Sequence, residues 1–183
     1  MKDLIFLVDF DRTITMNDST DELMNQYNPK MVEEYQKSFR RGDLRVREYI
    51  KGLLESLKIT KDEYKEAVTK NLIIDPDFKK FIELGYEMRI VSAGTYENIL
   101  PNFEKEGIDI PVEHIYSNKL TFNEDNIEIN FPFDNEDSDE GICKKTILLK
   151  YKNRCKKSVS GHGKFCRINK SCRTNAYSSY RSK

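Results

Sequence analysis

A short apolar run, Leu4 to Val8, is followed at once by two acidic residues, Asp9 and Asp11. The run is continuous rather than alternating and rich in residues that favour strands, which is typical of a parallel strand buried on both faces. In an open parallel sheet, ligands bind beyond the carboxyl ends of the strands. The run therefore predicts a buried strand that delivers two carboxylates to a binding edge. A pair of ordinary acids capping a turn is the alternative.

Helical patterns and further apolar runs alternate along the rest of the chain. Apolar positions recur at intervals of three and four from Ser19 to about Lys70, where Thr60 and Glu63 form a capping box, and this predicts several helices. A helix over 77–84, a strand ending at Ser92, a helix over 93–108, two strand-like pieces within 114–131 and a helix over 144–151 are expected next. Such alternation favours an α/β fold with a parallel sheet. Beyond residue 151 no period is sustained, and no strand is predicted there.

Composition bears on the class of protein. Of the 183 residues, 38% are hydrophobic and 34% charged, which fits one globular domain with room for a small insertion. No apolar run approaches the roughly 18 residues of a membrane span, and the N-terminus lacks the layout of a signal peptide. We therefore expect a cytoplasmic protein without a membrane partner.

Three motifs occur in an order that resembles the haloacid dehalogenase (HAD) superfamily of phosphatases. "DFDRT" (9–13) resembles its Asp-x-Asp-x-Thr motif, "IVSAG" (90–94) its second motif, and Lys144 in "GICKKTIL" its third. The wider run "DFDRTITMNDSTDELM" resembles the phosphoserine phosphatase-like branch and, in "TITMND", the methionine-salvage phosphatases. The resemblance covers residues 1–151. It implies a Rossmann-like HAD core, residues 1–15 and 72–151, with residues 16–71 inserted as a helical cap.

The resemblance also implies roles for individual residues. Asp9 would attack phosphorus to form an aspartyl-phosphate, and Asp11 would act first as general acid and then as general base. The remaining positions would support the loop or hold phosphate oxygens: Thr13 the loop, and Ser92, Ala93, Gly94 and Lys144 the phosphate. A capping serine and a solvated lysine are the structural alternatives for Ser92 and Lys144.

The implied cofactor is Mg2+, a hard cation that suits oxygen ligands and a phosphate substrate. Asp9 and Asp11 would supply two ligand positions. The family normally adds an acid from a fourth motif, Gly-Asp-x-x-x-Asp, but this chain has Gly161-His162-Gly163 in the expected place and no acid nearby. This departure puts the strength of metal binding in doubt.

The substrate is expected to be a small phosphorylated metabolite. Asp18, and Arg45 or Arg47, are candidate contacts on the cap, although charged residues on a helix more often form a solvated face. The sequence does not choose between phosphoserine and a methionine-salvage phosphate. It does not indicate an oligomeric state.

The C-terminal residues 152–183 differ from the rest. All 31 acidic residues lie in 1–140, whereas 13 of the 31 Lys and Arg residues and all four Cys residues lie in 141–183. A basic tail could bind nucleic-acid phosphates, and a second interpretation is a metal site made by Cys155, His162, Cys166 and Cys172, whose spacing matches no zinc pattern. A third is a shift of reading frame near codons 152 to 160, favoured because periodicity, acids and the fourth motif disappear together. The alternatives to a Mg2+-dependent phosphomonoesterase are therefore a catalytically impaired HAD-like protein and a phosphate- or nucleic-acid-binding protein.

Overall fold

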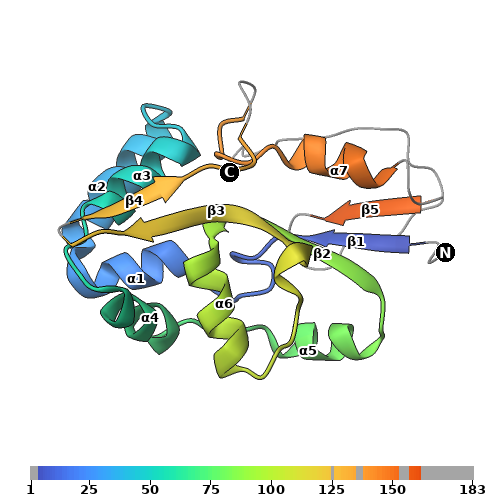
Figure 1. Ribbon diagram of the computed structural model, residues 1–183. Helices are drawn as coiled ribbons and strands as arrows, with labels where there is room; N and C mark the ends of the chain where they lie inside the picture. Colours follow the sequence, from blue (N-terminus) through green and yellow to red (C-terminus); the bar gives the residue numbers. More distant parts are fainter. Residues whose placement is uncertain (1–3, 125, 135–137, 153–156, 162–183) are drawn as a thin grey trace.

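The computed structural model describes residues 4–124, 126–134, 138–152 and 157–161. Five strands form one sheet in the order β4-β3-β2-β1-β5 (Figure 1). Their bounds are β1 Leu4–Val8, β2 Glu87–Thr95, β3 Ile115–Phe122, β4 Ile127–Asn130 and β5 Lys157–Gly161. All neighbours pair in parallel except β4, which is antiparallel to β3. The predicted α/β fold with a mainly parallel sheet is confirmed.

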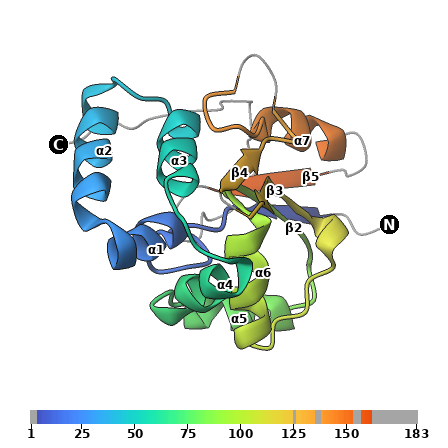
Figure 2. The same cartoon turned by 60° about the vertical axis from the view of Figure 1, so that its left-hand side comes forward.

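Helices cover both faces of this sheet (Figures 1 and 2). Helices α5 (Pro76–Glu83) and α6 (Tyr96–Lys105) lie on one face and α7 (Lys144–Lys152) on the other, and the 3-10 turn η1 (Val112–His114) precedes β3. Alternate side chains of β1 point to opposite faces. Phe6 and Val8 pack with the α5–α6 cluster, whereas Ile5 and Leu7 pack with α7. Burial on both faces is why the β1 sequence is a continuous apolar run.

Four helices, α1 (Ser19–Tyr27), α2 (Pro29–Arg41), α3 (Val46–Glu55) and α4 (Lys61–Lys70), fill the segment after β1. They share an apolar core with the β3–β4 hairpin, including Leu120, Ile127 and Ile129. None of the helices within the described ranges is long and apolar enough to cross a membrane.

The chain enters and leaves this helical group at one place. Thr15 and Ile74 form an antiparallel bridge, and the Met16 N–H donates to the Ile73 carbonyl at 2.8 Å. The two connections therefore run side by side. We propose on this basis that residues 1–15 and 72–151 form the core and residues 16–71 the cap.

Two segments differ from the sequence-based prediction. No strand was expected beyond residue 151, yet β5 pairs with β1 in register from Leu4–Lys157 to Val8–Gly161. The strand reads "KSVSG", so its sequence lacks an apolar run, and backbone pairing at the edge of the sheet forms it instead.

The second difference lies at the end of β2. The strand continues to Thr95 rather than ending at Ser92, and α6 begins at Tyr96 rather than at residue 93. Val91 pairs with Tyr116 and Thr95 with Asn118, so β2 advances four residues where β3 advances two. Such a bulge re-aims side chains and frequently lies beside a functional site.

Candidate active site

The loop after β1 is wound tightly around one carbonyl group. The Phe10 carbonyl accepts hydrogen bonds from the N–H groups of Thr13, Ile14 and Thr15 at 3.2, 2.9 and 3.1 Å. The Thr15 hydroxyl accepts the Arg12 N–H at 3.1 Å and lies 2.7 Å from the Asn17 carbonyl oxygen, to which it can donate. Thr15, which the sequence analysis did not select, therefore closes the loop. Thr13 takes part through its backbone, and the role of its hydroxyl stays a prediction.

Arg12 adopts a left-handed backbone conformation within this loop, with φ of 57°. Among the described residues it is the one non-glycine position with positive φ. This conformation costs an L-residue about 1–2 kcal/mol. The surrounding hydrogen bonds hold Arg12 there, and its guanidinium reaches Asp21 at 3.3 Å.

Asp9 and Lys144 meet at the carboxyl end of β1. Lys144 Nζ lies 2.9 Å from Asp9 Oδ2 and 3.1 Å from Glu140 Oε2, while Asp9 Oδ1 accepts the Phe10 N–H at 2.9 Å. Burial alone would lower the pKa of Lys144, but the charges of Asp9 and Glu140 outweigh it and raise the pKa. Lys144 is therefore a cation at neutral pH. Glu140 was not selected from the sequence, although it stands four residues before Lys144.

Asp11 lies against the bulge of β2. Its Oδ1 atom accepts the Ser19 N–H at 2.7 Å, and a Cβ placed on Gly94 would be 3.0 Å from Asp11 Oδ2 and 3.2 Å from Ser92 Oγ. Only a glycine leaves this space open. Burial, followed by the charge of Asp18, raises the pKa of Asp11 to about 8, although hydrogen bonding with Ser19 opposes the rise.

Ser92 is fully buried, and its hydroxyl accepts the Gly94 N–H at 3.0 Å. The bulge that contains Ser92, Ala93 and Gly94 leads directly into α6, whose N-terminus carries the positive end of the helix dipole. The fold thus brings Asp9, Asp11, Lys144 and this bulge together at the carboxyl ends of β1 and β2. The roles predicted for these residues remain proposals.

The three candidate substrate contacts all have structural partners. Asp18 is the N-cap of α1 and accepts two backbone N–H groups of that helix, each at 3.1 Å. Burial and then the charge of Asp21 raise the pKa of Asp18. Arg45 forms an exposed ion pair with Glu48, and Arg47 pairs with Asp134. Substrate contact by these residues stays a prediction.

A buried asparagine links the two halves of the site. Asn98 of α6 accepts hydrogen bonds from the hydroxyls of Tyr64 and Thr95 and donates to Ser19 Oγ at 2.8 Å. It therefore ties the start of α1, which holds Asp11, to the helix that follows the bulge. The sequence analysis missed Asn98 because a buried asparagine cannot be distinguished from an exposed one by periodicity.

The two acids at the end of β1 fit Mg2+ by donor type. Mg2+ is commonly held by one or two carboxylates together with substrate phosphate oxygens and water. Within the ranges that the structure describes, no cluster of three or more His, Cys, Asp or Glu groups could hold a metal ion. His162 and Gly163 of the fourth-motif position lie outside the described residues, as do Cys155, Cys166 and Cys172 of the alternative metal site.

Two solved structures share this architecture, although no protein-family model matches the chain. A HAD family hydrolase of Salmonella enterica serovar Typhi aligns with a TM-score of 0.65 and 16% identity, over 86% of this chain and 55% of that one. The chain has the haloacid dehalogenase fold. A phosphoserine phosphohydrolase-like protein of Francisella tularensis shares the HAD fold too, with a TM-score of 0.61 and 22% identity over 87% of this chain and 77% of that one.

Two curated relatives align with most of this HAD-fold chain, and one of them is a phosphatase by name. The bifunctional enzyme MtnB/MtnX of Bacillus licheniformis is 29% identical over 162 residues, 84% of this chain. The 2-hydroxy-3-keto-5-methylthiopentenyl-1-phosphate phosphatase of Bacillus mycoides is 25% identical over 154 residues, 80% of this chain. The chain spans 37% of the length of the first relative and 69% of the second.

Proposed function

We propose that this chain is a phosphomonoesterase that hydrolyses a small phosphorylated metabolite through an aspartyl-phosphate. The observation that carries the proposal is the 2.9 Å contact between Lys144 Nζ and Asp9 Oδ2 at the end of β1. In this proposal Asp9 is the nucleophile, and Lys144 is the cation that would neutralise the charge of the phosphoryl group in the transition state. The name of the relative from Bacillus mycoides, a phosphatase, supports the same reaction class.

In the first step, an oxygen of Asp9 bonds to phosphorus while the ester P–O bond breaks. Asp11 gives its proton to the departing oxygen. It can do so because it lies at the same end of the sheet as Asp9 and, with its pKa raised to about 8, is protonated at neutral pH. Lys144 and the bulge at 92–94 would hold the phosphoryl oxygens, for which the Gly94 N–H would exchange its present 3.0 Å bond to Ser92 Oγ for one to the phosphate.

In the second step, the Asp11 carboxylate takes a proton from water, and the water oxygen attacks phosphorus. The bond between Asp9 and phosphorus breaks, inorganic phosphate leaves, and Asp11 is again protonated for the next substrate. Asp11 thus serves as acid and then as base, which requires it to stay beside the reacting phosphorus in both steps.

Mg2+ is the proposed cofactor. The Asp9 carboxylate and, as the family resemblance implies, the Asp11 backbone carbonyl would hold it, which leaves the Asp11 carboxyl group free to carry its proton. When bound, Mg2+ would offset the negative charge that the phosphate brings to a site already containing Asp9, Asp11 and Asp18.

Among substrates, 2-hydroxy-3-keto-5-methylthiopentenyl-1-phosphate is the first candidate. Curated relatives that align with 80% and 79% of this chain are phosphatases named for this compound. Phosphoserine is the second, on the resemblance of the run at 9–24 to phosphoserine phosphatases. Helices α1–α4 would cover the site, exclude water and select the substrate.

The test is a hydrolysis assay of the full chain with both candidates and p-nitrophenyl phosphate, with Mg2+ and with EDTA. We expect Mg2+-dependent phosphate release that Asp9→Asn abolishes. Equal rates for the wild type and Asp9→Asn would reject the enzyme.

A second function, phosphate binding without turnover, is favoured because the described part of the chain contains no group of three or more His, Cys, Asp or Glu side chains that could hold a metal ion. Calorimetric binding of inorganic phosphate by an inactive wild type would support it. Nucleic-acid binding through residues 152–183 would instead appear as binding that weakens steeply with salt.

A further inference from the structure

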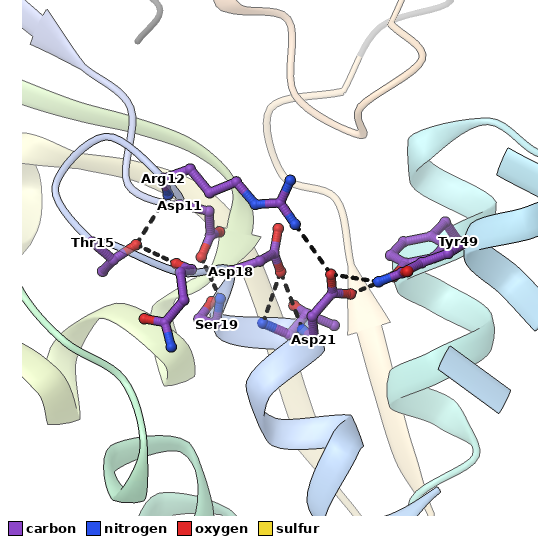
Figure 3. Close-up of polar contacts among 10 residues, drawn as sticks. Asp11, Arg12, Thr15, Asp18, Ser19, Asp21 and Tyr49 are labelled. Carbon is purple, nitrogen blue, oxygen red and sulfur yellow. Dashed lines mark hydrogen bonds and ion pairs between the residues drawn. The ribbon is translucent and has the colours of Figure 1, made fainter. Parts of the chain in front are cut away.

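Asp21, in the first turn of α1, is the place where several segments meet (Figure 3). Its Oδ2 atom accepts hydrogen bonds from Arg12 Nη2 at 3.3 Å and from Gln36 Nε2 of α2 at 2.9 Å. Its Oδ1 atom accepts one from the Tyr49 hydroxyl of α3. Asp21 is 9% exposed, and so buried a carboxylate needs hydrogen-bond or ion-pair partners to offset the free energy lost when water is removed from it. One carboxylate therefore joins the loop after β1 to three cap helices.

Asp11 is bound to the same helix. The Ser19 N–H donates to Asp11 Oδ1 at 2.7 Å, so the first residue of α1 holds Asp11 while Asp21, two positions later, holds Arg12. Figure 3 shows both contacts on one side of the start of α1. Because Asp11 and Arg12 are consecutive, a movement of α1 acts on both at once.

The backbone of this loop does not account for an arginine at position 12. Glycine adopts a φ of 57° with less strain than any L-residue, so the turn alone would favour it. What arginine adds is its contact with Asp21. Tyr49 remains a donor to the same carboxylate, because burial and its hydrogen bond to Asp21 raise the pKa of the phenol.

We propose that Arg12 is a positioning residue that acts through Asp21 to keep Asp11 aligned with the docked helices α1, α2 and α3. The inference rests on the proposed function, because that function gives Asp11 a reaction for which its position matters. Exposed ion pairs contribute little to stability, and the Arg12 side chain is 59% exposed. Its effect is therefore expected in turnover rather than in stability.

The test compares Arg12→Gly, Arg12→Lys and the control Arg41→Ala, which removes an exposed ion pair with Asp43 on α2. For Arg12→Gly we expect a melting temperature close to that of the wild type, since glycine relieves the strain and Asp21 keeps its hydrogen bonds from Gln36 and Tyr49. Its kcat on p-nitrophenyl phosphate should fall about tenfold with KM little changed, because a misplaced catalytic group slows the chemical step. Arg12→Lys should recover most of the kcat, and Arg41→Ala should match the wild type. Wild-type kcat in Arg12→Gly, or no recovery with lysine, would overturn the proposal.

A second readout does not depend on activity. The Ser19 amide proton is hydrogen-bonded to Asp11 Oδ1, so the rate at which this proton exchanges with solvent reports whether Asp11 stays in place. We expect Arg12→Gly to speed this exchange by about threefold or more relative to Arg41→Ala. If the wild type has no phosphatase activity, the proposed function fails, and unchanged Ser19 exchange in Arg12→Gly would then separately overturn the positioning role.

Discussion

Lys144 Nζ contacts Asp9 Oδ2 at 2.9 Å although the two residues are 135 positions apart. The contact follows from how α7 is packed. Lys144 is the first residue of that helix, and Ile147 and Tyr151 bury its inner face against Ile5 and Leu7 of β1. Because Asp9 directly follows the same strand, the apolar packing of α7 on β1 brings the lysine to the carboxylate.

Replacing Lys144 with methionine keeps a long side chain at this place and removes the charge. We expect kcat to fall by about 100- to 1000-fold, because the transition state would lose a cation beside the phosphoryl group. Lys145→Met is the matched control, since Lys145 is adjacent in sequence but exposed. Steady-state kinetics of both variants check the expectation, which is wrong if the two variants lose activity equally.

Gly94 is the point where the bulge of β2 meets Asp11. In Gly94→Ala the new methyl group would lie 3.0 Å from Asp11 Oδ2 and 3.2 Å from Ser92 Oγ, so one of them must move. We expect kcat to fall about tenfold or more, because small displacements of a catalytic group are costly. Gly85→Ala should show the opposite pattern: its φ of 66° strains alanine, but nothing lies within 4 Å, so stability and not kcat should fall. Kinetics and thermal melts of the two variants separate these effects.

The apolar patterns predicted most of the sheet and its covering helices from the sequence. Leu4–Val8 and the run before Ser92 are recognisable because burial on both faces leaves a continuous apolar stretch. Strand β5 escaped prediction because its stability comes from backbone pairing with β1, which leaves little trace in a sequence such as "KSVSG". The bulge after Val91 was missed for a related reason: register is a property of two strands, and neither reveals it alone.

At the candidate site, the sequence selected the residues whose chemistry is characteristic and missed those that hold them. Asp9 and Asp11 follow β1, Lys144 begins α7 and Ser92 lies in the last residues of β2, where motifs are readable. Asp21 and Asn98 act through contacts with other helices, and Thr15 acts through hydrogen bonds inside its own loop. Nothing in the local sequence distinguishes these three from ordinary loop or surface residues. Prediction fails where function depends on a contact between segments.

Arg47 and Asp134 form the contact between α3 and the segment before α7. The Arg47 guanidinium also lies 4.5 Å from the centroid of the Phe131 ring, and Asp134 Oδ1 is buried without a hydrogen-bond partner among the residues that the structure describes. We expect Arg47→Met to reduce the free energy of unfolding by about 1–3 kcal/mol, because it leaves a mostly buried carboxylate unpaired. The value is below that of a fully buried pair since the Arg47 side chain is 34% exposed.

Urea unfolding of Arg47→Met, beside Arg41→Ala as an exposed-pair control, measures this difference. Asp134→Asn in the Arg47→Met background should restore part of the lost stability, because it removes the unpaired charge. A loss no greater than that of Arg41→Ala would contradict the expectation.

Glu97 in the first turn of α6 should make stability depend on pH. Burial raises the pKa of Glu97 above its ordinary value of 4.5, although the hydrogen bond from the Leu120 N–H, at 2.9 Å, opposes the rise. The folded state therefore keeps a proton over a range in which the unfolded chain has released it, so this group lowers stability as pH rises from 4.5 through the folded pKa.

Glu97→Gln keeps an acceptor for the Leu120 N–H and removes the titration. The difference in unfolding free energy between variant and wild type, measured in urea from pH 4 to pH 8, should shift in favour of the variant as pH rises and then level off. A difference that is constant, or that shifts in favour of the wild type with rising pH, would show that burial does not control this carboxylate.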